Sequence, residues 1–293
     1  RLGMAGNLAN FELVDQAGET KLGQDIDYNG QKAGYTVDPQ ENIAYVSKHD
    51  NQTLWDNNMY KAATDATSAQ RAQMQILALS TNMLGQGIPF IHMGSELLRS
   101  KAMQRDSYDS GDWYNIVNYD MSSNNWNVGL PREDKDGPNW DLIKTIITDA
   151  NAQPTMEDIA WTDARFKELL KIRTSSPLFS LATEADVKAR VDFQNTGEDS
   201  VTGVIVMSID DGTSAGVDLD PAVDAIVAVI NATNEKQVIP VTGATGFALH
   251  SVLVEGTATF ADGSFTVPAL TTAVFVKAQD GEQGAGLAVD MSK

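Results

Sequence analysis

The sequence predicts a chain of two parts, an α/β part followed by an all-β part. Two short apolar segments, Ile43 to Val46 and Ile88 to Met93, flank a segment whose apolar residues recur at helical spacing, which is the pattern of a parallel strand–helix–strand unit. After Pro177 the chain changes to many short apolar segments separated by turn residues, which is typical of an antiparallel sandwich. We therefore predict one domain over residues 1–177 and a second over 178–293.

The α/β part is predicted to contain two helices between long polar stretches. Residues 1–40 are turn-rich and predict a long loop with short elements, and residues 95–140 predict a second, aromatic-containing loop. A helix is predicted over 68–84, because Thr67 and Gln70 have the spacing of a capping box and two glycines follow its end. Its predicted apolar face consists of Met74, Leu77, Ala78, Thr81 and Leu84. The second predicted helix covers 162–174, before Pro177.

The all-β part is predicted to begin with a half-buried strand over 187–193, because apolar and charged residues alternate there. Asp262-Gly263, between Phe260 and Phe265, predicts a tight hairpin. Further strands are predicted at 203–209, 225–230, 237–241, 247–254, 257–260, 264–267 and 271–276.

The composition excludes several classes of partner and chemistry. The 40 acidic and 21 basic residues give a net charge of −19, which disfavours nucleic acid and anionic membrane surfaces but not a neutral polysaccharide. The chain has no cysteine, which excludes disulfides and a Cys nucleophile, and it has no apolar run of about 18 residues that would span a membrane. Because it opens Arg1-Leu2-Gly3-Met4, without an initiator Met or a signal peptide, we expect the carboxyl-terminal piece of a longer protein.

A cluster of polar residues follows the strand predicted at Ile43 to Val46, and residues 46–56 read VSKHDNQTLWD. Functional groups of parallel barrels stand at the carboxyl ends of the strands. This string resembles the last active-site segment of the α-amylase superfamily, in the form found in bacterial pullulanases. The resemblance extends to QGIPFIHMGSELL (86–98), QRDSYDSGDWYN (104–115), NNWNVGLPR (124–132) and FKELLKIR (166–173).

The resemblance implies the C-terminal portion of a (β/α)8 barrel, with its last two strand–helix units, followed by an antiparallel β-sandwich domain. It implies hydrolysis of α-1,6 branch linkages in pullulan and limit dextrins with retained configuration. Carried over by position, Asp50 would steady the oxocarbenium-like transition state and His49 would hydrogen-bond the same sugar. These two residues are the expected catalytic residues of the chain.

A retaining glycosidase also needs a nucleophile and an acid/base. The family takes them from the fourth and fifth strands, and no segment of this chain resembles either strand. We therefore expect the isolated chain to be inactive and its site to be completed by the N-terminal remainder of the same enzyme, which carries the nucleophile Asp and the acid/base Glu. Two parallel strands alone also leave apolar faces exposed, which independently predicts a fragment.

Substrate contacts are expected mainly from the loop after the second strand. Arg105 and Asp106 are candidates as an ion pair for the next sugar, and the aromatic candidates either stack on sugar rings or anchor the loop. The full set of expected substrate-binding residues is Asn51, Trp55, Arg105, Asp106, Tyr108 and Trp113.

No cofactor is expected to be required, and no metal-binding residue is assigned. Asp106, Asp109 and Asp112 lack EF-hand spacing, although an oxygen-rich loop of this kind leaves a structural calcium ion open. His92 and His250 lie in apolar runs and are expected to be satisfied structural residues rather than metal ligands. The expected location, from the resemblance, is extracellular or at the cell surface.

Two alternatives remain open from the sequence. One is another α-glucan hydrolase of isoamylase or amylase type. The other is a non-catalytic carbohydrate-binding module at 185–278, against which stands the absence of Trp and Tyr from its predicted strands. The expected ligands in every case are α-glucans such as pullulan, limit dextrin and amylopectin.

Overall fold

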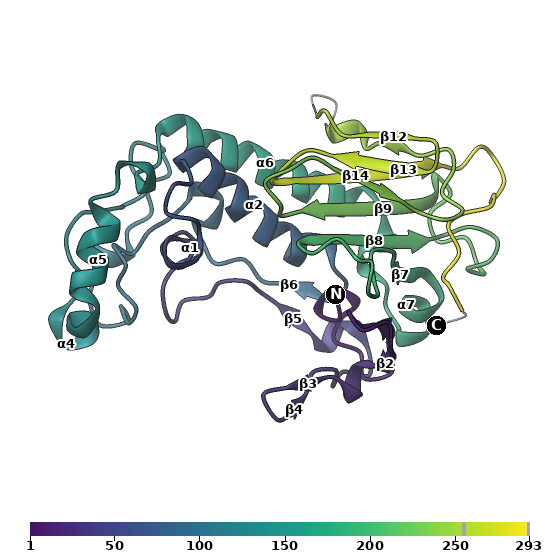
Figure 1. Cartoon of the computed structure of the whole chain (residues 1–293), viewed down its shortest axis with the longest axis horizontal. Helices are drawn as coiled ribbons and strands as arrows, with labels where there is room; N and C mark the ends of the chain where they lie inside the picture. Colours follow the sequence, from purple (N-terminus) through teal and green to yellow (C-terminus); the bar gives the residue numbers. More distant parts are fainter. Residues whose placement is uncertain (254–255, 292–293) are drawn as a thin grey trace. The chain divides into compact units, whose positions relative to one another are not determined.

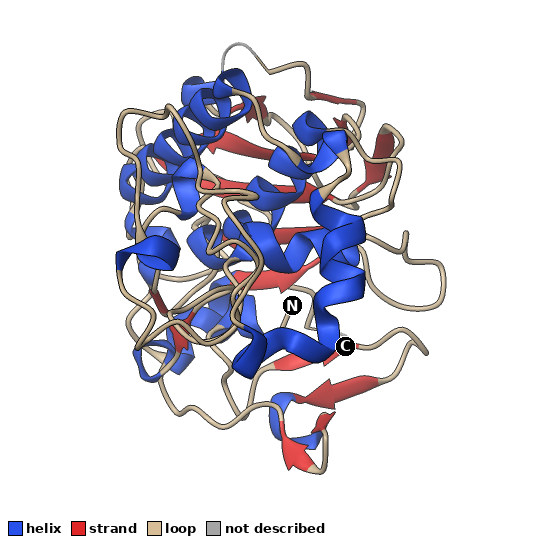
Figure 2. Ribbon diagram, turned by 90° about the vertical axis from the view of Figure 1, so that its left-hand side faces the viewer, coloured by secondary structure: helices blue, strands red, loops and turns tan. Residues whose placement is uncertain are grey.

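The computed structural model describes residues 1–253 and 256–291 and contains both helices and strands (Figures 1 and 2). The chain divides into two compact units that are each discontinuous in sequence. Unit 1 comprises Arg1–Ala44, Ser80–Pro89 and Glu168–Lys293, and unit 2 comprises Tyr45–Leu79 and Phe90–Lys167. Helices α2 (Ser68–Leu84) and α6 (Met156–Ser175) each contribute residues to both units.

Unit 1 contains two antiparallel sheets of three or more strands. The five-stranded sheet has the order β11-β14-β9-β8-β7, and the three-stranded sheet has the order β10-β13-β12. Their strands are β7 (Val191–Phe193), β8 (Val204–Asp210), β9 (Val223–Asn231), β10 (Gln237–Pro240), β11 (Ala248–Leu249), β12 (Thr259–Ala261), β13 (Ser264–Val267) and β14 (Thr271–Ala278). The strands predicted at 203–209, 225–230, 237–241, 264–267 and 271–276 are confirmed. The strand predicted at 257–260 shifts to β12, and the one predicted at 247–254 shortens to β11, with residue 254 outside the described part of the chain.

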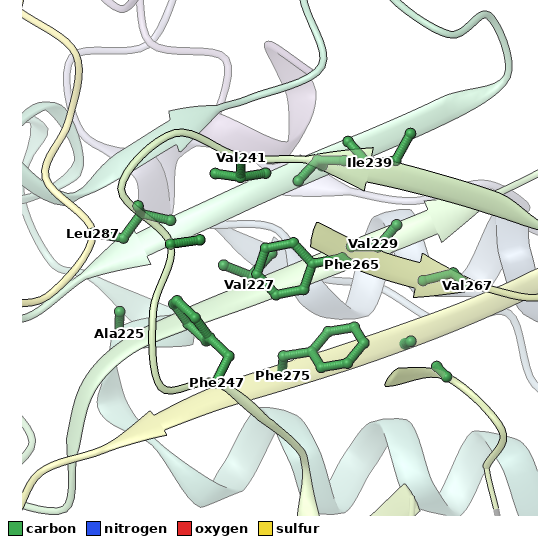
Figure 3. Close-up of a cluster of buried hydrophobic side chains, with 14 of the residues drawn as sticks. Ala225, Val227, Val229, Ile239, Val241, Phe247, Phe265, Val267, Phe275 and Leu287 are labelled. Atoms are coloured by element: carbon green, nitrogen blue, oxygen red, sulfur yellow. The ribbon is translucent and has the colours of Figure 1, made fainter. Parts of the chain in front are cut away.

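Side chains from both sheets meet in one hydrophobic cluster (Figure 3). Phe265 of β13 is fully buried there, and its ring lies 5.3 Å from Phe247, 4.8 Å from Phe260 and 4.9 Å from Phe275, measured between centroids. Edge-on and tilted ring pairs of this kind add to the free energy gained by removing apolar surface from water. The phenylalanines of this region therefore stabilise the packing of the two sheets.

The hairpin between β12 and β13 confirms the turn predicted from Asp262-Gly263. Ala261 pairs with Ser264 across a two-residue loop, and both loop residues have positive φ, 48° at Asp262 and 74° at Gly263. Left-handed backbone at both positions matches the twist of the flanking strands, and Asp and Gly adopt it at low cost.

One strand prediction is wrong in its first half. Residues Glu184–Arg190 form helix α7, and only Val191–Phe193 forms a strand. The side chain of Thr183 caps the helix by accepting a hydrogen bond from the backbone N–H of Asp186 at 3.1 Å. Val187 and Val191 are four residues apart, so the same apolar positions also fit one face of a helix.

The predicted parallel pair of strands is present but short. Strand β5 (Ile43–Ala44) pairs in parallel with β6 (Ile88–Pro89), so the apolar residues that follow each strand lie outside the sheet. The N-terminal stretch holds two antiparallel pairs, β1 (Glu12–Val14) with β2 (Thr20–Leu22) and β3 (Asp27–Tyr28) with β4 (Gln31–Lys32). This matches the predicted loop with short elements.

Helix α2 begins with the predicted capping box. The backbone N–H of Gln70 donates to Thr67 Oγ1 at 3.2 Å, and the backbone N–H of Thr67 donates to Gln70 Oε1 at 2.9 Å. The predicted apolar face is only partly right, because Leu77 and Leu84 are buried but Met74, Ala78 and Thr81 are only half-buried, and residues on another side of the helix are buried instead. These are Ala72, Ile76, Leu79 and Met83.

Unit 2 contains four helices that the sequence pattern does not predict. They are α1 (Leu54–Lys61), α3 (Asp112–Asn115), α4 (Glu133–Asp136) and α5 (Trp140–Ile147). Its hydrophobic cluster includes Trp55, Leu98, Met103, Trp126 and Ile143, so much of the stretch predicted as a polar loop is anchored to a core. Within the described residues, no helix combines the length and apolar character that crossing a membrane requires.

Candidate active site

The chain segments that leave β5 and β6 stay in contact within unit 2. The rings of Tyr45 and Phe90 are edge-on with centroids 6.5 Å apart, and Ser47 Oγ lies 3.3 Å from His92 Nδ1. Parallel strands bring their carboxyl ends to the same edge. The two sequence motifs that carry the resemblance are therefore adjacent in space.

His49 and Asp50 present their side chains to solvent at this edge. The His49 side chain is 80% exposed and that of Asp50 is 58% exposed, with 3.6 Å between His49 Nε2 and Asp50 Oδ1. Lys48 is ion-paired with Asp50, and this hydrogen bond lowers the pKa of the Asp50 carboxyl, with smaller contributions from the charges of His49 and Lys101. The carboxylate is thus an exposed, ionised group available to a ligand.

A buried carboxylate, Asp56, ties this segment to the loop after β6. Asp56 lies in the first turn of α1, three residues after the N-cap residue Thr53. Its carboxylate accepts hydrogen bonds from Ser100 Oγ at 2.5 Å and from the backbone N–H of Lys101 at 2.8 Å. Burial raises the pKa of Asp56 to about 6, against the opposing effect of these donors. Sequence reasoning missed this residue, although the Thr-x-x-Asp spacing is a helix-start signal that marks it.

Lys101 is the second residue that sequence reasoning missed. Its side chain is almost fully buried, and its ammonium donates a hydrogen bond to the carbonyl oxygen of His49 at 3.1 Å. Burial lowers the pKa of the ammonium. A lysine in a polar stretch of sequence is normally an exposed residue, so no local signal marks it.

His92 is a satisfied structural residue, as expected. Its Nε2 lies 3.3 Å from Arg99 Nη1, and because a guanidinium can only donate, Nε2 accepts and the proton resides on Nδ1, facing Ser47. Burial and the neighbouring Arg99 charge lower the pKa of His92 to about 4. His250 is also satisfied, since its Nδ1 accepts from the backbone N–H of Val252 at 3.2 Å.

The predicted ion pair between Arg105 and Asp106 is replaced by other contacts in the described structure. Arg105 Nε donates to Asn51 Oδ1 at 3.2 Å, and Asp106 Oδ2 is ion-paired with Lys135 Nζ at 3.1 Å. Asn51 has a left-handed backbone, with φ of 60°, directly after Asp50. The Arg105–Asn51 contact therefore brings one candidate from each motif together.

The three aromatic candidates differ in exposure. Tyr108 is 83% exposed and Trp113 is 57% exposed, so both rings present area to solvent. Trp55 is fully buried in the hydrophobic cluster of unit 2, which corrects its assignment as a substrate-binding residue. Its position in the first turn of α1 points the indole into the core, a direction that the motif alone does not reveal.

Two carboxylates of the loop after β6 are paired with basic side chains. Asp106 pairs with Lys135, and Asp109 Oδ1 pairs with Arg132 Nη1 at 2.9 Å. Across residues 1–253 and 256–291, no three His, Cys, Asp or Glu residues are grouped to hold a metal ion. The Asp106 and Asp109 carboxylates are therefore already paired with basic side chains, and we assign calcium no step.

The comparisons with known proteins define the class. Residues 121–278, more than half of the chain, match the C-terminal family model of pullulanase-type α-1,6-glucosidases. The chain therefore belongs to this family of glycoside hydrolases. It matches the C-terminal part of pullulanases.

Curated relatives from bacteria and plants are similar over nearly all of the chain. The identity is 47% to a pullulanase of Klebsiella pneumoniae, over 99% of this chain, and 40% to the chloroplastic pullulanase 1 of Arabidopsis thaliana, over 95%. The chain spans only 27% and 30% of the lengths of these two proteins.

Solved structures of pullulanases are also similar to nearly all of this chain. Ligand-free PulA from Klebsiella pneumoniae matches with a TM-score of 0.96 and 50% identity, over 99% of this chain and 28% of that one. A maltotriose complex of PulA from the same organism matches with a TM-score of 0.95 and 49% identity, over 99% of this chain and 32% of that one.

Proposed function

We propose that this chain supplies the transition-state-stabilising carboxylate and several sugar contacts of an enzyme that cleaves α-1,6-glucosidic branch linkages with retained configuration. The observation that carries the proposal is the exposed His49–Asp50 pair beyond β5, in a chain whose structural relatives include a pullulanase complexed with maltotriose. The proposed substrates are pullulan, limit dextrins and amylopectin.

Asp50 acts in this proposal by opposing the positive charge that develops at the anomeric carbon. Its lowered pKa keeps it ionised at neutral pH, which is the form that the role requires. His49 hydrogen-bonds the hydroxyls of the same sugar. Hydrogen bonds and charges that tighten as the ring flattens can lower the barrier by several kcal/mol.

The neighbouring residues hold the rest of the glucan. Asn51 and Arg105 present an amide and a guanidinium to sugar hydroxyls, and Asp106 adds an acceptor beside Lys135. Tyr108 and Trp113 offer exposed rings for the apolar C–H faces of sugar rings. Trp55 has no part in this set.

The nucleophile Asp and the acid/base Glu come, in this proposal, from the N-terminal remainder of the same enzyme. Residues 1–177 are then the C-terminal portion of a (β/α)8 barrel that the remainder completes. Large apolar side chains of unit 2 are exposed just beyond the strands, with Tyr45 at 51%, Phe90 at 48% and Met93 at 57%. Exposed large apolar side chains of this kind favour an interface with the rest of the enzyme, because such surface is normally covered by protein.

Residues 178–293 are proposed to form a β-sandwich domain, supported by the two antiparallel sheets that share one core. Nothing favours a separate carbohydrate-binding role for it. Phe247, Phe265 and Phe275 are buried, and Phe260 packs against their cluster, so these rings are unavailable as sugar platforms. An extracellular or cell-surface location of the enzyme stays a prediction from the resemblance.

The test uses the complete enzyme that contains this chain. Asp50→Asn keeps the shape of the side chain and removes its charge, and we expect kcat on pullulan to fall by about 100-fold or more. Asp141→Asn, at a fully exposed position on α5, is the matched control and should retain wild-type kcat. Unchanged kcat in the Asp50 variant would overturn the proposal.

A further inference from the structure

The burial of Lys101 is unusual for a lysine. The residue is 1% exposed, and a charged ammonium is costly to remove from water unless it is hydrogen-bonded or paired. The structure gives this group one directed hydrogen bond, to the carbonyl oxygen of His49 at 3.1 Å. The acceptor is the backbone of the segment that carries the candidate catalytic side chains.

Lys101 is itself held from the other direction. Its backbone N–H donates to Asp56 Oδ2 at 2.8 Å, and Asp56 belongs to helix α1, which begins a few residues after Asp50. Lys101 is therefore hydrogen-bonded both to His49 and to Asp56, which lies further along the same segment. A single residue of the loop after β6, Lys101, thus holds residues 49–56 at both ends.

The backbone around Lys101 is in an unfavourable conformation. Leu98, Ala102 and Met103 have φ values of 54°, 50° and 62°, in the left-handed region that non-glycine residues avoid. Each such residue costs on the order of 1 kcal/mol and persists only where surrounding contacts determine it. All three are fully buried, and the backbone N–H of Gln104 closes the turn by donating to the Lys101 carbonyl at 2.9 Å.

We propose that Lys101 is a positioning residue of the active site: its ammonium holds the His49 carbonyl and so fixes the direction in which His49 and Asp50 present their side chains to the sugar. The inference rests on the proposed function. Because Lys101 is buried, it acts through the peptide of His49 and not by touching substrate.

The charges around the two groups are consistent with this role. Asp50 faces the positive charges of Lys48, His49 and Lys101, and Lys101 faces Asp50, Asp56, Arg99 and Asp106. Lys48 is partly exposed and lies two residues before Asp50 in the same segment. Lys101, in contrast, is a cation of the loop after β6. Its removal should also raise the pKa of Asp50.

The experiment compares Lys101→Met with Lys61→Met in the complete enzyme. Lys61 is exposed at the end of α1 and serves as the control for loss of a lysine in the same unit. We expect Lys101→Met to lower kcat on pullulan by about 100-fold with little change in KM, because misplacing a catalytic group by about 1 Å costs this much.

A second pair of variants keeps the test decisive if Lys101→Met does not fold. Lys101→Arg retains charge and donors, and Lys101→Gln retains a shorter neutral donor. We expect the Arg variant to recover kcat to within about 10-fold of wild type and the Gln variant to remain lower, at equal folded fraction by circular dichroism. Wild-type kcat in Lys101→Met, or in the Gln variant, overturns the inference, as does a loss of kcat that only matches the loss of folded protein. Asp50→Asn distinguishes the proposed function from the positioning role of Lys101. If Asp50→Asn abolishes activity while the Lys101 variants keep wild-type kcat, the positioning role fails and the proposed function stands.

Discussion

The ammonium group of Lys101 and the carbonyl oxygen of His49 lie 3.1 Å apart, although 52 residues separate them in the sequence. This contact joins the loop after β6 to the segment after β5. The side chains that the resemblance marks as catalytic, His49 and Asp50, are exposed, whereas the group that holds their backbone is buried. The candidate site thus consists of solvent-facing side chains whose backbone is hydrogen-bonded to buried residues.

Asp56 is the residue on which that support depends, and replacing it should be strongly destabilising. Asp56→Ala leaves Ser100 Oγ and the backbone N–H of Lys101 without their buried acceptor, so we expect a loss of about 2–4 kcal/mol in the free energy of unfolding. Urea unfolding followed by circular dichroism measures it. Asp141→Ala, on the exposed face of α5, should change stability by less than about 0.5 kcal/mol. Equal stability of the two variants would contradict the assigned role.

His92 should titrate far below an ordinary histidine. Its pKa is lowered to about 4, from a reference of 6.5, because partial burial disfavours the charged imidazolium and the neighbouring Arg99 guanidinium repels it. Since the folded protein holds the neutral form, the stability that His92 contributes is fully present above pH 6.5 and is lost as the pH falls toward 4. Imidazole NMR of the labelled protein should find the proton on Nδ1 and no titration of His92 between pH 5 and 8. A midpoint near 6.5 would contradict this account, and Arg99→Met should move the midpoint upward.

Local chemistry accounts for the parts of the structure that the sequence predicts well. The Thr67–Gln70 capping box and the Asp262-Gly263 hairpin depend on side chains within three residues of each other, and both are present. The capping of α7 by Thr183 is equally local, but the alternation of apolar residues after it favoured a strand. Periodicity over so few residues fits either element.

Long-range contacts account for what the sequence does not predict. Trp55 belongs to a motif that suggests sugar stacking, yet it is buried in a hydrophobic cluster with residues from distant segments, including Leu98 and Trp126. The burial of Lys101 likewise depends on a segment 52 residues away. The resemblance therefore identifies the candidate residues Asp50 and His49 but says nothing of the residues that hold them.

The capping box gives a second stability prediction. Thr67→Ala removes the side chain that accepts from the Gln70 N–H and should lower the free energy of unfolding by about 1 kcal/mol, because an N–H at the start of α2 loses its partner. Thr67→Ser keeps the hydroxyl and should remain near wild type. Denaturant midpoints of the two variants compare them, and a Ser variant as unstable as the Ala variant would argue against the cap.

The core of unit 1 should be most sensitive at Phe265. Phe265→Ala removes a fully buried ring that contacts three other phenylalanines, so we expect a loss of about 3–5 kcal/mol. Val238→Ala, at an exposed position on β10, is the control and should have a small effect. Guanidinium unfolding is the measurement, and a cost below about 1 kcal/mol for the Phe265 variant would place the core elsewhere.

The most direct test of the account is the initial rate of reducing-end release from pullulan by separated parts of the enzyme. The 293-residue chain alone should release nothing above the blank. Adding the remainder that carries the other two carboxyl groups should restore hydrolysis, and the same mixture made with the Asp50→Asn chain should stay inactive. Hydrolysis by the purified chain alone, or full activity with the Asp50→Asn chain, would contradict the claim that Asp50 serves a site completed from outside this chain.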